Sequence, residues 1–330
     1  MIKYIIKRIG TAVVTLGLIT VVVFFIIQLP PGDFVDSIIT EMITAGDPVT
    51  EEMIVILREA YGVDRPFIIQ YFDWLSGLLT GNWGVSFFHQ QNVLTVINET
   101  LVATLILSLV TLIFTYFLSI PAAIFSAKNQ YSIGDYIVTA LGFVGMAIPN
   151  FLFAILLMYF SFRWLGHPLM GLPNEPVSDW ASFVEWVQAL IIPTIVIGTS
   201  GTAALIRFVR AQLLDEMGKP YVLAARAKGV SENTITYKYQ MRSVLNPIVS
   251  DLGNLISSIF TGSTIAAIVL MLPTLGPVLL TALQTQDIYL SGGILLISAI
   301  LVVMGNLISD LLLMVLDPRI NLLKGGGKAK

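Results

Sequence analysis

Long apolar runs constrain this chain more than any other feature of its sequence. A helix needs about 20 apolar residues to cross a bilayer, and several runs reach that length, the first over residues 9–29. Hydrophobic residues make up 56% of the chain and charged residues only 12%. Backbone amides inside a bilayer are satisfied only in helices or closed barrels, and runs of this length favour helices. The sequence therefore predicts an all-α membrane protein.

Six transmembrane spans are predicted from these runs. They cover residues 9–29, 101–126, 137–162, 189–208, 248–272 and 293–316. The long polar segment between the first two spans contains two amphipathic stretches, residues 50–61 and 66–79, so we expect an outer helical segment there. The predicted domains are residues 1–30 (N-terminus and span 1), 31–98 (extracytoplasmic segment), 99–316 (permease core, spans 2 to 6) and 317–330 (tail).

Lys and Arg residues indicate the orientation, because cytoplasmic loops carry an excess of them. With six spans, the basic N-terminus, the turn at Lys128, the loop of residues 207–246 and the basic tail all fall on one side. The other side receives most of the acidic residues, concentrated between residues 33 and 73. Both termini and the basic loop are therefore predicted to be cytoplasmic.

The basic loop has its own helical signals. Pro220 suits the first turn of a helix, where its missing N–H is no loss, and Gly229 is placed to end that helix. Ser231 can cap a second, longer helix. Ala224 and Ala225 would form a small-residue edge that lets the backbone of another protein approach closely. These patterns predict a docking surface of two helices with a glycine break.

The string YVLAARAKG at residues 221–229 closely resembles the "EAA" coupling loop of ABC importer permeases, in the form usual for the oligopeptide, dipeptide and nickel group. Leu223 replaces the glutamate of the general motif, and Arg242 stands at the position of its proline, which comes later as Pro247. Further resemblances cover nearly the whole chain: LPPGD at 29–33, YGVDRP at 61–66 and LDPRI at 316–320. The chain is identified as similar to the first-type (B) permease subunit of a binding-protein-dependent importer.

This resemblance implies the fold of a type I ABC importer transmembrane domain, with a coupling loop at residues 209–246. The residues implied in contact with the ATPase are Tyr221, Ala224, Ala225, Arg226, Lys228 and Gly229. The implied partners are a homologous second permease, two cytoplasmic ABC ATPases that bind ATP and Mg²⁺, and an extracytoplasmic peptide-binding protein. The implied location is the prokaryotic plasma membrane, and the implied activity is import of oligopeptides or dipeptides by alternating access.

The translocation pathway must be polar through amides, hydroxyls and backbone, because the predicted spans are nearly free of charge. Pro149 and Gly201 would loosen local helix bonding, which is tolerated where the backbone lines a cavity. The candidate pore-lining residues are Asn150, Thr199, Ser200, Thr202, Ser257 and Thr261. Ser, Thr and Gly also serve simple helix packing in membranes, so this second interpretation stays open.

Several kinds of chemistry have no support in the sequence. The absence of cysteine excludes disulfides and thiolate metal sites, and no stretch matches the phosphate-loop motif of an ATPase. We therefore expect no catalytic residue, no metal site and no cofactor in this chain, and its slightly negative net charge gives no support for a nucleic-acid partner. The alternatives left open are nickel, glutathione or another small solute as cargo, an ATP-independent channel, and a membrane-embedded enzyme.

Overall fold

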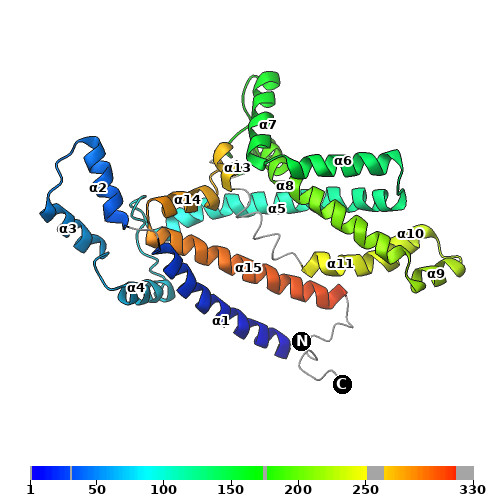
Figure 1. The fold of residues 1–330 in the computed structure, drawn as a ribbon, viewed down its shortest axis with the longest axis horizontal. Coiled ribbons are helices and arrows are strands. Elements are labelled where there is room, and N and C mark those ends of the chain that lie inside the picture. Colours follow the sequence, from blue (N-terminus) through cyan, green and yellow to red (C-terminus); the bar gives the residue numbers. More distant parts are fainter. Residues whose placement is uncertain (1, 30–31, 174–176, 251–263, 317–330) are drawn as a thin grey trace. The chain divides into compact units, whose positions relative to one another are not determined.

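The computed structural model describes residues 2–29, 32–173, 177–250 and 264–316, and every regular element in these ranges is helical (Figure 1). The chain forms two compact units. Unit 1 comprises residues 1–102 and 273–301, and unit 2 comprises residues 103–272 and 302–330. The long helices α5 (Val93–Lys128) and α15 (Ile288–Leu316) contribute residues to both units. The all-α fold class predicted from the sequence is confirmed.

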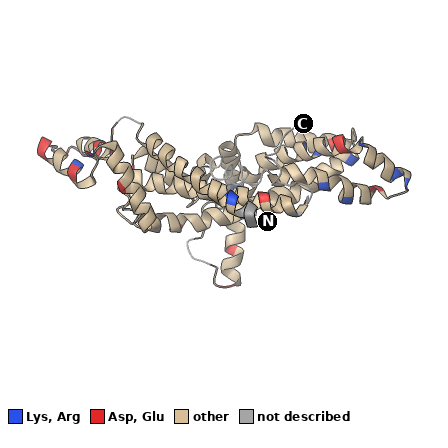
Figure 2. Cartoon of the chain, turned by 90° about the horizontal axis from the view of Figure 1, so that it is seen from below, with Lys and Arg blue, Asp and Glu red and all other residues tan. Residues whose placement is uncertain are grey.

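Unit 1 contains the polar segment that follows the first apolar helix, α1 (Ile2–Ile27). Three helices occupy this segment: α2 (Phe34–Ala45), α3 (Glu51–Tyr61) and α4 (Phe67–Thr80). As the sequence predicts, Thr50 caps α3 by accepting a hydrogen bond from the Met53 amide. Acidic residues occur along all three helices and are coloured red in the cartoon of Figure 2.

A buried carboxylate joins the polar segment to the start of α15 within unit 1. Asp287 is fully buried and accepts hydrogen bonds from the Ser86 hydroxyl at 2.6 Å and the Phe88 amide at 3.1 Å. Its other oxygen accepts from the amide of Leu290 at 3.1 Å, near the start of α15. Three donors thus offset the cost of burying this charge, and they fix the loop before α5 against α14 (Leu275–Gln284) and α15.

Unit 2 is built around the long helix α8 (Trp180–Met217), against which α6 (Ile133–Ala147) and α7 (Asn150–Leu165) pack. The predicted third span, which the sequence interrupts at Pro149 and Asn150, is bent at that place in the structure: α6 and α7 meet at an angle of 102°. Ile148 precedes Pro149 and takes the extended conformation that proline imposes on its predecessor, with φ −82° and ψ 121°. The helix therefore ends at Ala147 and restarts in a new direction.

The described residues contain four helices that are long and apolar enough to cross a bilayer, or five spans if the bent pair counts as one. These helices are Ile6–Ile27, Val93–Lys128, Trp180–Met217 and Ile288–Met314. The predicted span over residues 248–272 lies largely outside the described residues, which resume at α13 (Thr264–Val269). The count of six spans stays a prediction.

A buried ion pair ties three helices of unit 2 together. Asp135, in the first turn of α6, is 2% exposed and receives two hydrogen bonds from the Arg210 guanidinium of α8, at 2.9 and 2.8 Å. The Ser126 hydroxyl of α5 also donates to this carboxylate and accepts from Arg210. A bidentate arginine–carboxylate pair has fixed geometry, so these helix ends are locked in one relative position.

Replacement of Asp135 by Asn should destabilise unit 2 by about 3 kcal/mol, because it leaves a largely buried arginine without its counter-charge. Loss of α-helical ellipticity during titration with sodium dodecyl sulfate, on detergent-solubilised protein, measures this change. The matched control is Asp215→Asn, an exposed aspartate of α8. Equal denaturation midpoints for Asp135→Asn and Asp215→Asn would show that the pair contributes nothing to stability.

Candidate functional site: the coupling segment

The segment that carries the predicted docking surface folds as the sequence predicts. Helix α9 (Pro220–Ala227) has Pro220 in its first turn, and Gly229 ends it with φ +75°. The next helix, α10 (Glu232–Thr234), begins at Ser231, whose side chain accepts a hydrogen bond from the Thr234 amide. We call residues 216–243 the coupling segment; it runs from the end of α8 through α9 and α10 and on to the first residues of the helix that follows.

A small apolar core holds the coupling segment together. Val222 and Ile235 are fully buried, and Ala225 is 7% exposed beside them, with Val230 packed against all three. The predicted edge of two exposed alanines is therefore only half present. Ala224 is exposed, but Ala225 faces inward, because consecutive residues of a helix point about 100° apart. The small side chain of Ala225 fits into this core between Val222 and Ile235.

The outward face of α9 is apolar at its centre and basic at its end. Tyr221 is 39% exposed and Leu223 is 55% exposed, and Ala224, Arg226 and Lys228 are exposed as well. Figure 2 colours the Lys and Arg residues of the chain blue along its backbone. The face combines an apolar patch with positive charge, and a complementary surface would be apolar and acidic.

An ion pair bridges the glycine break. The Arg226 guanidinium donates to both carboxylate oxygens of Glu232, at 2.7 and 3.1 Å. This contact lowers the pKa of Glu232 and raises that of Arg226, so the pair stays charged at neutral pH. Both side chains are exposed, and an exposed pair contributes little to stability; it connects α9 and α10 across the break at Gly229.

The segment after α10 contains a π-helix, η1 (Ile235–Gln240), which passes into α11 (Met241–Ser250). Such π-helical turns are rare and are frequently found at functional sites. Gln240 lies in η1 with 1% exposure, and neither its amide oxygen nor its nitrogen has a hydrogen-bond partner among the described residues. Lys128, at the end of α5, donates to Asn233 at 2.8 Å. The sequence patterns described above predict neither the π-helix nor the contact between Lys128 and Asn233.

The predicted pore-lining residues do not form one described site. Thr199 and Thr202 of α8 both line an apolar cavity of about 450 Å³. The Thr199 hydroxyl donates to the carbonyl of Ile195 in its own helix, and the Thr202 hydroxyl is buried with no hydrogen-bond partner among the described residues. Asn150 begins α7, and Ser200 is half-buried on α8. Ser257 and Thr261 lie outside the described residues.

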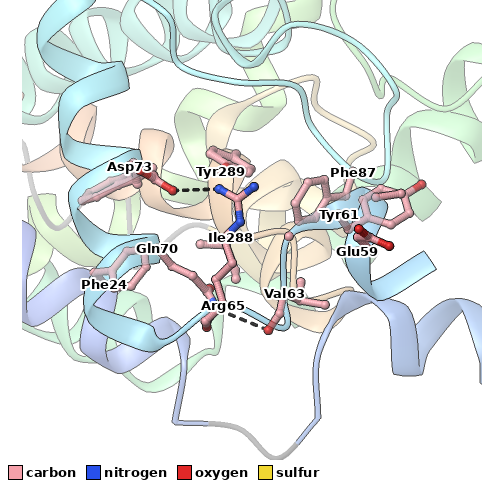
Figure 3. Close-up of a pocket in the computed structure, with 13 residues that line it drawn as sticks. Phe24, Glu59, Tyr61, Val63, Arg65, Gln70, Asp73, Phe87, Ile288 and Tyr289 are labelled. Carbon is pink, nitrogen blue, oxygen red and sulfur yellow. Dashed lines mark hydrogen bonds and ion pairs between the residues drawn. The ribbon is translucent and has the colours of Figure 1, made fainter. Parts of the chain in front are cut away.

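Unit 1 holds a second cavity, of about 190 Å³, shown in Figure 3. Its wall is largely aromatic and includes Phe24, Tyr61, Trp74, Phe87 and Tyr289. The Arg65 side chain extends into it and pairs with Asp73 at 3.1 Å. The charge of Arg65 is therefore neutralised by Asp73, which lines the same cavity. Among the described residues, no group of three or more His, Asp or Glu side chains is arranged to hold a metal ion.

The chain matches known transport proteins along nearly all of its length. Residues 119–322 match the family described as "binding-protein-dependent transport system inner membrane component", and residues 1–110 match the N-terminal domain of such membrane components. The oligopeptide permease protein AppB of Bacillus subtilis is 34% identical, with 97% of this chain and 99% of that protein covered. The dipeptide permease protein DppB of Lactococcus lactis is 29% identical, with 98% and 100% covered.

A solved structure shares the fold. The methionine ABC transporter MetNI, in an inward-facing conformation, superposes with a TM-score of 0.52 over 68% of this chain and 97% of its own, at 17% identity. The architecture is that of a type I ABC importer transmembrane domain, a multi-pass membrane protein. The chain belongs to the family of binding-protein-dependent transport system inner membrane components. It is a permease subunit and not an enzyme.

Replacement of Gly229 by Val should abolish transport and leave membrane insertion intact. A Cβ at Gly229 meets no atom within 4 Å, so the penalty is conformational: a left-handed φ costs an L-residue roughly 1–2 kcal/mol and more when it is β-branched. Uptake of labelled substrate by cells, normalised to the amount of inserted protein, measures the effect.

The matched control is Gly218→Val at the end of α8. Gly218 has equally open surroundings, but its φ of −85° is accessible to any residue. Normal uptake by Gly229→Val, or equal loss in both variants, would contradict a special role for the left-handed turn.

Proposed function

We propose that this chain is the first-type permease subunit of an ATP-driven importer of oligopeptides or dipeptides. It would form half of the translocation pathway, with a homologous second permease forming the other half. Its termini and the coupling segment would be cytoplasmic, in the plasma membrane of a prokaryote. Relatives that match over almost their entire length are named as oligopeptide and dipeptide permeases, and this supports the cargo class.

The observation that carries the coupling role is the geometry of α9. The helix has its own buried core of Val222, Ala225 and Ile235, yet its opposite face is exposed and partly apolar. An exposed apolar face on a firmly held helix is suited to a protein partner. We assign this face to one of two cytoplasmic ATPases, which would bind ATP and Mg²⁺, while a peptide-binding protein delivers cargo from outside.

The proposed mechanism is alternating access. Closure of the ATPases would displace α9, and its attachment to α8 would pass that displacement to the spans. Because Arg210 of α8 is locked to Asp135 of α6, α6 and α8 would move as one body. ATP hydrolysis would then reset the pathway.

Two alanine-to-glutamate substitutions test the docking face. Ala224→Glu places a carboxylate on the exposed face and should release the ATPase that contacts this chain from a tagged, gently solubilised complex while the permease pair stays intact. Ala225→Glu buries a charge in the small core of α9, which is costly, so it should also expose the segment to limited proteolysis. Co-purification and proteolysis report the two effects separately.

The control for these variants is Ala45→Glu, at an exposed alanine at the end of α2. This variant should keep its ATPases. If Ala224→Glu retains ATPase subunits at the wild-type ratio to the permease, α9 does not form the contact with the ATPase.

The cargo class requires a separate measurement. Proteoliposomes that hold the complete complex should accumulate a labelled dipeptide or oligopeptide only with internal ATP and external binding protein, and nickel or glutathione should not compete. Accumulation of nickel or glutathione in place of peptide would assign the chain to another cargo of the same family, and flux without ATP would indicate a channel.

A further inference from the structure

Glu216 is a buried carboxylate at the junction of α8 and α9. It is 4% exposed and lies in the last turn of α8. That position is electrostatically unfavourable, since the C-terminal end of a helix carries partial negative charge. A buried anion placed there needs compensation from elsewhere in the structure.

Three side-chain donors supply that compensation. Lys219, the residue before α9, and Ser243 of α11 both donate to one carboxylate oxygen, the latter at 2.9 Å. The hydroxyl of Tyr221, in the first turn of α9, donates to the other oxygen. Burial and the bond to Glu216 raise the pKa of Tyr221, so this phenol remains a donor at any physiological pH. One carboxylate thereby joins α8, α9 and α11.

Other contacts between α9 and the end of α8 are sparse. Gly218 lies between the two helices with no atom within 4 Å of a Cβ built on it, and the Lys219 amide donates to the Glu216 carbonyl across the break at 3.2 Å. The core of α9 is formed with Val230 and Ile235, which follow it, and not with α8. Glu216 thus provides a direct side-chain link between the end of α8 and the start of α9, beside the apolar packing of α8 on α11.

We propose that Glu216 is a positioning residue that makes α8 and α9 move together, so that movement of the coupling helix reaches the membrane spans. This inference rests on the proposed function, in which α9 contacts an ATPase. Glu216 itself touches neither nucleotide nor cargo. Its removal should uncouple ATP hydrolysis from transport and leave the subunits assembled.

The first measurement is a distance distribution. The chain has no cysteine, so Ala211→Cys on α8 and Ala227→Cys on α9 can carry two spin labels in the full chain in nanodiscs. Both positions are exposed. Electron–electron double resonance should give one narrow distribution for this labelled background and a broad one after Glu216→Ala. The control is Glu185→Ala, an exposed glutamate of the same helix, which should leave the distribution narrow.

The second measurement is coupling in the complete complex. Glu216→Ala should lower the number of peptides transported per ATP hydrolysed on the order of tenfold, since it removes several charge-assisted hydrogen bonds. Glu216→Gln keeps oxygen and nitrogen at the same positions and should retain a narrow distribution and part of the coupling. Glu216→Ala and Ser243→Ala should be strongly non-additive when combined, because they act through one contact.

The outcomes separate this inference from the proposed function. If the wild-type complex holds no ATPases or transports no peptide, the proposed function fails, whatever the spin-label result. If wild type transports and Glu216→Ala does so with the same stoichiometry, or uncouples while its distance distribution stays narrow, the positioning role is overturned. If Glu216→Ala and Glu216→Gln both lower the amount of assembled complex and the transport rate in parallel, and the number of peptides transported per ATP hydrolysed stays the same, Glu216 is a stability contact and not a positioning residue.

Discussion

The ion pair between Asp135 and Arg210 is the interaction on which unit 2 depends. It places a carboxylate from the first turn of α6 and a guanidinium from α8 in a bidentate contact, with Ser126 of α5 bound to both. Helices in a bilayer gain little from hydrophobic association, because lipid is as apolar as their side chains. The charged pair fixes the orientation of α5, α6 and α8 relative to one another, which apolar packing alone does not do. The coupling segment then extends from the end of α8.

The coupling segment continues this arrangement with different chemistry at each step. Glu216 ties the end of α8 to α9 and α11, the core around Val222 keeps α9 folded, and the pair of Arg226 with Glu232 spans the glycine break. Each contact is local, and together they make a short helix rigid while one face stays exposed. We propose that, because the segment is rigid, a displacement of α9 is passed on to the membrane-spanning helices.

Local structure in this chain was largely predictable from the sequence. The start of α9 at Pro220, the left-handed turn at Gly229 and the cap at Ser231 all follow from the properties of single residues. The same holds for Thr50 at α3. The family that the resemblance of residues 221–229 indicated was confirmed, whereas the contact residues and the pore-lining residues remain predictions.

The membrane class, the all-α fold and the ends of the short helices follow from the sequence, because apolar length and capping act over a few neighbouring residues. Three features follow from tertiary packing instead: Ala225 faces inward while Ala224 faces out, α6 and α7 meet at 102°, and Glu216 accepts a hydrogen bond from a serine 27 residues away. These features depend on which distant groups share a buried site. A buried charge is retained only where such partners converge on it, and no local pattern records that convergence.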